Sequence, residues 1–336
     1  MTHQQLQTID ADTLLSTTLP PTRFIIDRLL PQGLHILAGA PKVGKSWLAL
    51  WLCLQVAQGT SVWDFPTHRG TVLYLCLEDS LTRIQSRLFQ ITDDAPEALH
   101  FATIAAGIGE GLEEQLTNFL TQHPDTSLVV IDTLQRIRTG SDSGNPYAND
   151  YRDISVLKAL ADKHHIAILL IHHLRKMNDD DPMNMISGTT GISGATDSNF
   201  VLKERRRGSG EATLYCTGRD IEYRELPLVF DKSGYTWRLT EPVEGECISI
   251  DPEAISLSAF LRGLGGFEGT ATELSALEAK TGERLTPSVL SKRLVKYAEV
   301  LEQNGIRVVS ERTRTTRTLS ILCLPCDGSD GCDGKN

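Results

Sequence analysis

The 336-residue chain has no apolar stretch approaching the roughly 18 residues that a membrane-spanning helix requires. Its first residues, Met1-Thr2-His3-Gln4-Gln5, lack the basic and then apolar order of a secretory signal peptide. Its seven cysteines are an odd set without an even disulfide framework. We therefore expect a cytoplasmic protein in a reducing environment, without a membrane partner.

Ligands for a closed zinc site are also missing. Cys323, Cys326 and Cys332 lie near the C-terminal end without a nearby histidine, whereas structural zinc sites use four ligands. The sequence favours a flexible acidic tail over residues 325–336 instead.

The chain has no overall positive charge of the kind that nucleic-acid-binding proteins often carry, because its net charge is −10. The charge is uneven, however. Residues 284–317 hold eight Lys or Arg against three acids, a local charge of +5. This asymmetry indicates a nucleic-acid contact near the end of the chain. A solvated helix of mixed charge is the other reading of the same residues.

The most informative feature that is present is a phosphate-binding loop. Gly39-Ala40-Pro41-Lys42-Val43-Gly44-Lys45-Ser46 matches the pattern G-x-x-x-x-G-K-[ST]. A strand-like run at 34–38 precedes it and a helix-forming run at 47–54 follows, which argues against a chance match by a glycine-rich turn. The loop would then open a helix whose N-terminus faces an anion.

This loop predicts ATP and Mg²⁺ as cofactors. Lys45 is expected to reach the β- and γ-phosphates, and the Ser46 hydroxyl to hold the metal ion. The residues expected to bind the nucleotide are Gly39, Ala40, Pro41, Lys42, Val43, Gly44, Lys45, Ser46 and Trp47.

The rest of the front half predicts an α/β fold. Apolar runs without polar alternation indicate strands of a parallel sheet that helices cover on both faces. The expected strands include 71–77, 128–131 and 166–171, with helices at 80–89, 111–122 and 151–164. Shorter runs at 212–217, 226–230 and 234–239 predict antiparallel strands at one edge of the sheet.

Two acids follow expected strands and are candidates for the site. Asp132 ends the run Leu128–Ile131 and is expected to bind Mg²⁺, although a helix-capping role is the alternative. Glu78 follows 71–77, at the end of a parallel strand where ligands bind, and can polarise the attacking water. Glu78 is favoured over Asp79 because the strand period turns Asp79 to the other face.

Two histidines, His172 and His173, end a third expected strand. They could sense or contact the γ-phosphate. Adjacent residues on a strand point to opposite faces, which disfavours one metal ion bound by both, and one ring could be a core histidine. The sequence does not decide between the two, and His172 is the favoured choice.

The last folded segment, 254–324, predicts a small α+β domain. Helical patterns at 271–280 and 287–304 precede a hairpin over 306–322 whose tip carries Arg312, Arg314 and Arg317. This order is typical of a winged helix-turn-helix, with 288–304 as the groove-reading helix. A small interaction domain with a charged, solvated face is the alternative.

Five motifs in order resemble the RecA-like ATPases, and most closely the plasmid RepA-type hexameric replicative helicases and their relatives in phages and mobile elements. They lie at 39–46, 75–79, 129–136, 170–176 and 187–197, and the resemblance covers about 24–239. The domains expected are therefore a lead-in at 1–23, a RecA-like core at 24–241, a linker at 242–253, the winged-helix-like domain at 254–324 and the tail.

The resemblance implies a homo-hexameric ring with ATP between neighbouring subunits. It assigns phosphate and metal binding to Lys45 and Ser46, the catalytic base to Glu78, metal binding to Asp132 and γ-phosphate sensing to the histidine pair. It also implies an arginine finger shortly after Asp197 that acts on the neighbouring subunit. Arg205 is the choice, Lys203 is its companion, and Arg206, Arg207 and Arg219 stay open; a solvated basic turn is the alternative reading of the cluster.

The chain departs from that family in two ways. About 85 residues follow the linker after the core. The expected channel loops, 139–150 and 175–185, are not notably basic. We expect an ATP-hydrolysing motor that acts on single-stranded DNA in replication of a plasmid, phage or integrated element, with a replication initiator or primase as a possible partner. The alternative is an ATP-dependent regulator or loader whose C-terminal domain binds DNA or a protein. A metabolic kinase is disfavoured because no acceptor site is visible.

Overall fold

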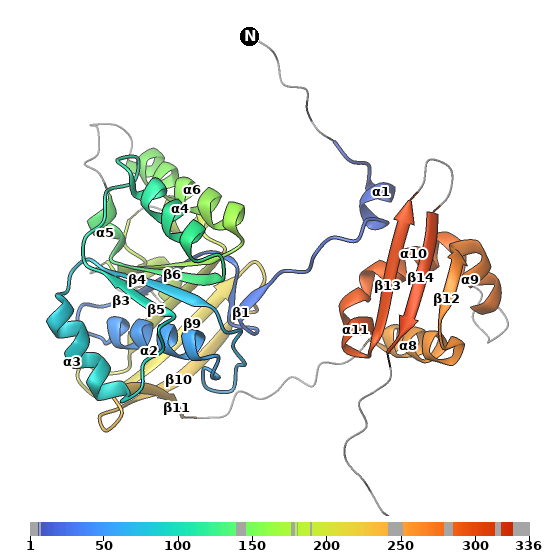
Figure 1. Cartoon of the computed structure of the whole chain (residues 1–336). Coiled ribbons are helices and arrows are strands. Elements are labelled where there is room, and N and C mark those ends of the chain that lie inside the picture. The colour runs from blue at the N-terminus through green and yellow to red at the C-terminus, as the bar shows by residue number, and fades with distance from the viewer. Residues whose placement is uncertain are drawn as a thin grey trace, which may run out of the picture. The chain divides into compact units, whose positions relative to one another are not determined.

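The computed structural model describes residues 6, 8–138, 146–175, 179, 181–188, 190–240, 251–278, 285–312 and 317–324 (Figure 1). The chain divides into two compact units. Thr22–Glu244 forms one unit, and the segment up to Pro21 belongs with the residues from Gly245 onward in the other. The N-terminal segment is thus grouped with the C-terminal domain and not with the sheet that follows it in sequence.

The larger unit is built on a nine-stranded sheet of order β11-β10-β9-β8-β3-β7-β6-β4-β5. Six strands are parallel: β3 (Gly33–Gly39), β4 (Thr71–Cys76), β5 (Leu99–Ala102), β6 (Thr126–Asp132), β7 (Ala167–His173) and β8 (Ser198–Glu204). Three antiparallel strands complete one edge: β9 (Glu211–Gly218), β10 (Arg224–Asp231) and β11 (Thr236–Leu239). The predicted α/β class with antiparallel edge strands is confirmed.

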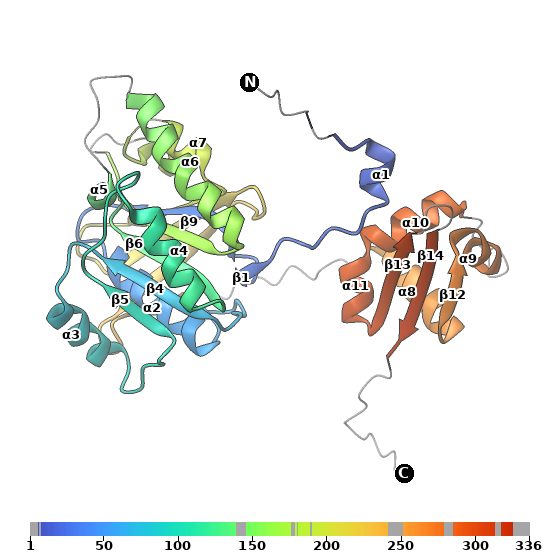
Figure 2. The ribbon, with the colours of Figure 1, turned by 45° about the horizontal axis from the view of Figure 1, so that its top comes forward.

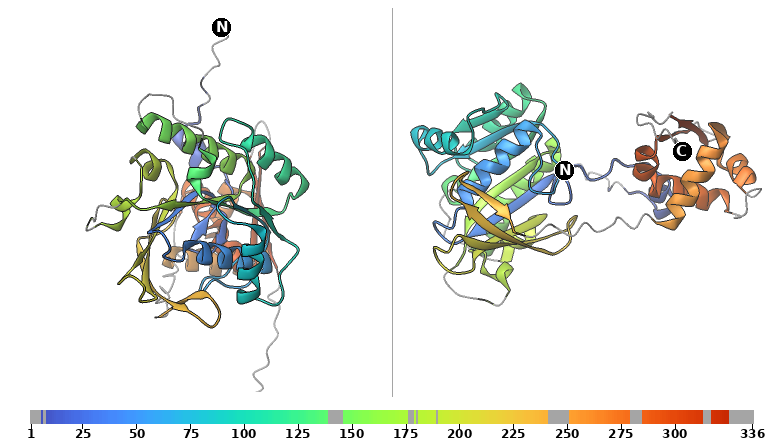
Figure 3. Two further views of the ribbon diagram at one scale, coloured as in Figure 1. Left: turned by 90° about the vertical axis from the view of Figure 1, so that its left-hand side faces the viewer. Right: turned by 90° about the horizontal axis from the view of Figure 1, so that it is seen from below.

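Helices cover both faces of this sheet (Figures 1 and 3). One face carries α2 (Lys45–Gln58) and α3 (Leu81–Ile91), with the small ribbon β1 (Phe24–Ile26) and β2 (Leu30–Pro31). The other carries α4 (Leu112–Gln122), α5 (Leu134–Ile137), α6 (Pro146–His164) and α7 (Thr190–Ala195), with the 3₁₀ turn η1 (Pro182–Met185) nearby in sequence. No described helix is both long and apolar enough to cross a membrane.

Successive side chains along each strand point to alternate faces of the sheet. On β6, Leu128 and Val130 pack in the core beneath α2, whereas Val129 and Ile131 pack in the core beneath α6. Both faces are buried, which explains why the strand sequences are continuous apolar runs. The same period places Asp132 on the α2 face.

The strand register brings the functional motifs to one edge of the sheet. Gly39 at the end of β3 is level with His173 on β7 and with Leu202 on β8. Asp132 at the end of β6 is level with Cys76 on β4 and with Ile171 on β7. The carboxyl ends of these parallel strands therefore form a single edge, where open α/β sheets bind ligands.

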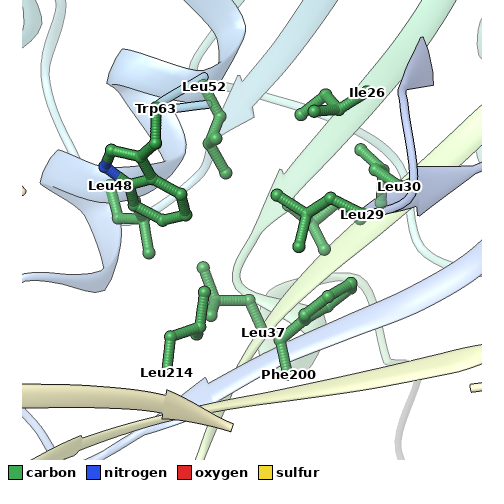
Figure 4. A pocket seen from close by; sticks show the side chains of 10 residues that line it. Ile26, Leu29, Leu30, Leu37, Leu48, Leu52, Trp63, Phe200 and Leu214 are labelled. Carbon is green, nitrogen blue, oxygen red and sulfur yellow. The ribbon is translucent and has the colours of Figure 1, made fainter. Parts of the chain in front are cut away.

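A small apolar cavity lies within the core beneath α2 (Figure 4). Its volume is about 20 Å³, and its lining is entirely hydrocarbon and aromatic, with Leu48 and Leu52 of α2 facing Ile26, Leu29 and Phe200. A space without polar partners does not hold ordered water or phosphate. This cavity is a packing gap and not the candidate site.

The smaller unit is an α+β domain (Figure 2). Its elements are α8 (Pro252–Leu264), β12 (Phe267–Thr270), α9 (Ala271–Glu278), α10 (Pro287–Lys296), α11 (Ala298–Gln303), β13 (Ile306–Arg312) and β14 (Arg317–Cys323). The sheet is antiparallel with the order β12-β14-β13. The order helix, strand, helices, hairpin is that of a winged helix, as predicted. The short α1 (Ala11–Leu15) belongs to the same unit.

One prediction about this domain is wrong: residues 288–304 do not form one helix. The helix is interrupted at Tyr297, which ends α10 and precedes α11 with φ −103° and ψ 14°. The Tyr297 ring is buried, and its hydroxyl donates to the carboxylates of Asp251 and Glu253 at the start of α8. Arg314 and the side chains of Arg312 and Arg317 lie outside the described residues.

Candidate active site

The phosphate loop joins β3 to α2 and leaves the N-terminus of that helix open. Gly44 is the N-cap residue at φ +96°, a conformation that favours glycine, and no side chain caps the helix. Gly39 is packed so closely that a Cβ there would lie 2.9 Å from the carbonyl oxygen of Leu202. The first backbone N–H groups of α2 are thus free of a capping side chain at the end where a helix attracts anions.

Lys45 lies folded into the loop. Its Nζ donates to the carbonyl oxygens of Gly39 at 2.8 Å and Ala40 at 2.9 Å. Burial lowers the pKa of Lys45 to about 8, and the carboxylates of Asp132 and Glu78 oppose that shift. Exchanging two carbonyl partners for phosphate oxygens would give the ammonium group stronger, charge-assisted hydrogen bonds.

Ser46 and Asp132 are in direct contact. Ser46 Oγ donates to Asp132 Oδ2 at 2.7 Å, and the buried Tyr74 hydroxyl donates to the same oxygen at 2.8 Å. Burial raises the pKa of Asp132, and these two hydrogen bonds counteract that rise. Tyr74 lies on β4 and was not anticipated from the sequence, although it shares the strand phase of Cys76 on the α2 face.

Glu78 lies beside this pair and is open to solvent. Its Oε1 accepts a 3.0 Å hydrogen bond from Thr133 Oγ1, and Arg136 Nε lies 4.0 Å from the same oxygen. The Glu78 side chain is 47% exposed, so water can reach it. Its charge acts on both Lys45 and Asp132, which places all three groups in one site.

The neighbouring Asp79 has a different environment. Its two carboxylate oxygens pair with Arg83 at 2.8 Å and with Arg87 at 2.6 Å, both on α3. These contacts tie the strand end to the following helix. Asp79 is therefore engaged away from the phosphate loop, in keeping with the preference for Glu78.

The residues at this edge fit Mg²⁺ and a nucleoside triphosphate. A hydroxyl and a carboxylate oxygen, already 2.7 Å apart in Ser46 and Asp132, are the hard oxygen ligands that Mg²⁺ uses beside phosphates and water. No cluster of three or more metal-ligating side chains occurs among the described residues. A bound Mg²⁺ would neutralise charge on the phosphates, and its remaining ligands would come from the nucleotide and water.

The two histidines lie on opposite faces of β7. His172 is buried on the α6 side, and its Nε2 lies 2.9 Å from the carbonyl oxygen of Ser187. Burial lowers the pKa of His172. The strand period places His173 with Leu169 and Ile171 on the α2 face, level with Gly39. The structure thus places His173, and not the favoured His172, on the face of α2 and level with the phosphate loop, while the role of either ring stays a prediction.

The candidate arginine fingers are also separated by the fold. Lys203, Arg205, Arg206 and Arg207 lie at and beyond the end of β8, on the same edge as the phosphate loop. The Arg205 side chain is 83% exposed, with Glu211 Oε2 at 3.7 Å. Arg219 lies at the opposite edge, 3.5 Å from Asp197 Oδ1. Only the cluster after β8 shares an edge with the site.

Trp47 does not point into the loop. Its ring stacks on Tyr235 with centroids 5.1 Å apart, and the Arg87 guanidinium lies 5.4 Å from its centroid. Only the backbone N–H of Trp47, in the first turn of α2, can face a phosphate. Another residue that the sequence did not suggest reaches the loop: Trp237 Nε1 donates to the carbonyl oxygen of Gly44 at 3.3 Å.

The phosphate loop, the acid pair Glu78 and Asp132, and the parallel sheet define a RecA-like P-loop ATPase. Residues 2–179 match the sequence profile of a family described as "AAA domain". This match covers more than half of the chain, and the chain belongs to that family. No curated protein matches the sequence significantly.

Solved structures share the fold at low sequence identity. The chain is similar to a solved "ATPase Domain" with a TM-score of 0.52 and 15% identity, over 62% of this chain and 85% of that one. It is equally similar to a DnaB-like replicative helicase, described with its interactions with primase, at a TM-score of 0.52 and 15% identity over 66% of this chain. The likeness spans 63% of the helicase chain. At this identity the likeness shows the fold, and the predicted RecA-like core is confirmed.

Proposed function

We propose that this protein is an ATP-driven motor that acts on single-stranded DNA during replication, as a RepA-like helicase of a plasmid, phage or integrated element. The observation that carries the proposal is the contact of Ser46 with Asp132 beside the solvent-open Glu78. These residues lie at the edge of a sheet whose fold is similar to that of a DnaB-like replicative helicase. This geometry supports hydrolysis, because it supplies a metal site and a carboxylate that water can reach.

Each residue has a distinct role in the proposed reaction. Lys45 and the open N-terminus of α2 hold the phosphates, and Ser46 and Asp132 hold Mg²⁺. Glu78 orients the attacking water and accepts its proton, while Thr133 fixes the carboxylate through its 3.0 Å hydrogen bond. His173 is the ring that senses the γ-phosphate, in place of the predicted His172.

The test is the ATPase rate with and without single-stranded DNA, for the wild type and Glu78→Gln. We expect DNA to stimulate the wild type strongly and the variant to lose that stimulation while it still binds ATP. Removing a positioned base lowers kcat by about 10² to 10⁴. ATP binding with negligible turnover in both proteins would refute the motor.

We further propose that the site is completed by a neighbouring subunit in a homo-hexamer, with Arg205 as the finger. Its exposure on the nucleotide edge supports this role. Mixing Arg205→Ala subunits with Lys45→Ala subunits tests it, because each mixed interface can combine one intact loop with one intact finger. Partial recovery of activity is expected, and its absence in verified mixed rings would contradict the choice of Arg205.

A second candidate function is an ATP-dependent regulator or loader whose C-terminal domain contacts DNA or a partner such as an initiator or primase. Ion pairs between three cations of α10 and acids of the same unit favour a protein as the partner of that domain. Lys292 pairs with Asp12 at 2.8 Å, Arg293 with Glu253 at 2.8 Å, and Lys296 with Asp251 at 3.3 Å. Cations that already have acidic partners attract phosphates less strongly.

Binding of the full chain to duplex DNA over a range of salt concentrations tests whether the C-terminal domain contacts DNA or a protein. A steep loss of affinity with salt that weakens in Lys292→Ala would assign DNA contact to α10. Salt-independent or undetectable binding would favour a protein partner.

The described cysteines, Cys53, Cys76, Cys216 and Cys323, are free, which suits the proposed setting in a reducing cytoplasm.

A further inference from the structure

The four tryptophans of the chain gather along one side of α2. With Phe230 and Tyr235 they form an aromatic wall, which we define as Trp47, Trp51, Trp63, Phe230, Tyr235 and Trp237. Ring contacts join Trp51 to Trp63 at 5.5 Å and Phe230 to Trp237 at 5.2 Å, and a hydrogen bond from Trp63 to Trp237 links these two groups of rings. The wall packs the β10–β11 hairpin against the helix that the phosphate loop opens.

Trp237 connects this wall to the phosphate loop. The residue is 2% exposed, and its Nε1 donates to the carbonyl oxygen of Gly44 at 3.3 Å. Its ring also fills the space beside Gly44, since a Cβ on that glycine would lie 3.1 Å from Trp237 Nε1. The contact joins residues 193 positions apart in the sequence.

A second tryptophan holds Trp237 in place. Trp63 Nε1 donates to the main-chain carbonyl oxygen of Trp237 at 2.7 Å. The two indole N–H groups thus form a relay from the loop after α2, through β11, to Gly44. A buried indole usually needs a partner for its N–H group, and both partners here are main-chain carbonyls.

The orientation of the Gly44 carbonyl controls the loop because the peptide bond is planar. The Gly44 oxygen and the Lys45 N–H lie in one rigid plane and point in opposite directions across the C–N bond. Leu48 N also donates to this oxygen at 3.0 Å, which is the first hydrogen bond of α2. Trp237 adds a donor from outside the helix and so fixes this plane, in which the Lys45 N–H points away from the helix, toward where a phosphate would bind.

We propose that Trp237 is a positioning residue for ATP binding, which acts by holding the Gly44–Lys45 peptide in the orientation that the phosphates require. Trp63 supports it as the second member of the relay. The proposal rests on nucleotide binding at the phosphate loop and not on the action of the protein on DNA.

The test compares Trp237→Phe with the wild type in binding of a slowly hydrolysed ATP analogue and in steady-state ATP hydrolysis. Phenylalanine keeps an aromatic ring and removes the N–H donor. We expect Kd and KM for the nucleotide to rise about three- to tenfold, as for loss of one neutral hydrogen bond. The kcat should stay near the wild-type value, because the contact is made equally before and during the reaction.

Trp51→Phe is the matched control, because Trp51 belongs to the aromatic wall through its ring contact with Trp63 and does not contact Gly44 in the described structure. It should leave Kd unchanged. Trp63→Phe should raise Kd less than Trp237→Phe, and the double variant should match Trp237→Phe alone. If Trp237→Phe does not fold, the comparison of Trp63→Phe with Trp51→Phe tests the proposal instead. A higher Kd for the nucleotide in Trp63→Phe supports it, and equal Kd values contradict it.

Unchanged nucleotide affinity in Trp237→Phe, with only a lower unfolding temperature, would overturn the proposal and leave Trp237 a packing residue. A rise in Kd of equal size for Trp51→Phe would overturn it as well. A wild-type protein that fails to bind the analogue would instead contradict ATP binding itself, and the proposal with it. Normal ATP binding without DNA stimulation contradicts only the motor.

Discussion

Replacing Asp132 by asparagine separates the metal-binding role of this residue from a structural one. Asp132 is 8% exposed, and its carboxylate accepts hydrogen bonds from Ser46 and Tyr74 on a single oxygen, Oδ2. Asparagine has the same shape, and its carbonyl oxygen has two lone pairs that can accept both hydroxyl groups. The substitution therefore removes the negative charge and keeps the hydrogen bonds.

The expected cost to folding is small. Both hydroxyl donors keep a partner, so the free energy of unfolding should change by no more than about 1 kcal/mol. Burial raises the pKa of Asp132, which means that the folded protein already disfavours the charged form there. Removing the charge relieves that penalty and offsets a poorer fit of the amide group.

The expected cost to catalysis is large. Changes to groups that only support a metal ligand lower metal affinity about 10- to 100-fold, so loss of a charged ligand should cost at least that much. The assay is ATP hydrolysis over a wide range of Mg²⁺ concentration at constant ATP, beside urea unfolding of the same protein. The half-activating Mg²⁺ concentration should rise at least tenfold, and kcat should fall.

An Asp132→Asn protein with the Mg²⁺ dependence of the wild type would refute the assignment. A loss of about 3 kcal/mol or more in unfolding free energy, with Mg²⁺ dependence unchanged, would show that Asp132 is a structural residue. Ser46→Ala is the companion variant, because it removes the hydroxyl that lies 2.7 Å from the carboxylate. It should raise the Mg²⁺ requirement in the same direction.

Three further predictions concern other parts of the molecule. Asp79→Asn, beside Glu78, should leave kcat within about twofold and lower the unfolding free energy by about 1–3 kcal/mol, because the Asp79 side chain is only 13% exposed and pairs with both Arg83 and Arg87. A large fall in kcat would contradict this. Burial lowers the pKa of His35 from 6.5 to about 4. The contribution of this residue to the unfolding free energy is therefore complete above pH 6.5 and is lost as the pH falls towards 4. Between pH 7 and 5 the unfolding free energy of His35→Gln should fall by about 2 kcal/mol less than that of the wild type. Leu261→Ala, at a fully buried site of the C-terminal unit, should cost about 2–5 kcal/mol in unfolding of that unit while ATP binding is kept, which calorimetry with and without nucleotide would detect.

The fold of the core follows from signals that are local in the sequence. Strands buried on both faces need continuous apolar runs, and β6 and β7 are such runs followed by polar residues. The phosphate loop lies directly between a strand-like run and a helix-forming run in the sequence. These features predict the parallel sheet and place Lys45 and Asp132 at one edge without knowledge of distant contacts.

The choice between the two histidines needed the register of the sheet. His172 and His173 are equally consistent with the end of a strand, and the pairing of β7 with β3 shows that His173 is level with Gly39. Alternation along the strand gives the face of each ring. Leu169 and Ile171 pack beneath α2, where Ile171 is level with Asp132, and His173 has the same phase as these two residues.

Long-range side-chain contacts explain what the sequence could not predict. Helical spacing continues through Tyr297, and the break there accompanies hydrogen bonds from its hydroxyl to Asp251 and Glu253, which lie 46 and 44 residues away. Trp237 is one apolar residue of an edge strand until the fold brings it to Gly44. No local pattern predicts either contact.

The most direct test of the proposed motor is strand separation of a DNA duplex that carries a single-stranded tail. The wild type should release the strand in the presence of ATP and Mg²⁺, and Glu78→Gln should bind ATP and release none. Hydrolysis of ATP by the wild type while the strands stay annealed would contradict the motor and favour the regulator or loader.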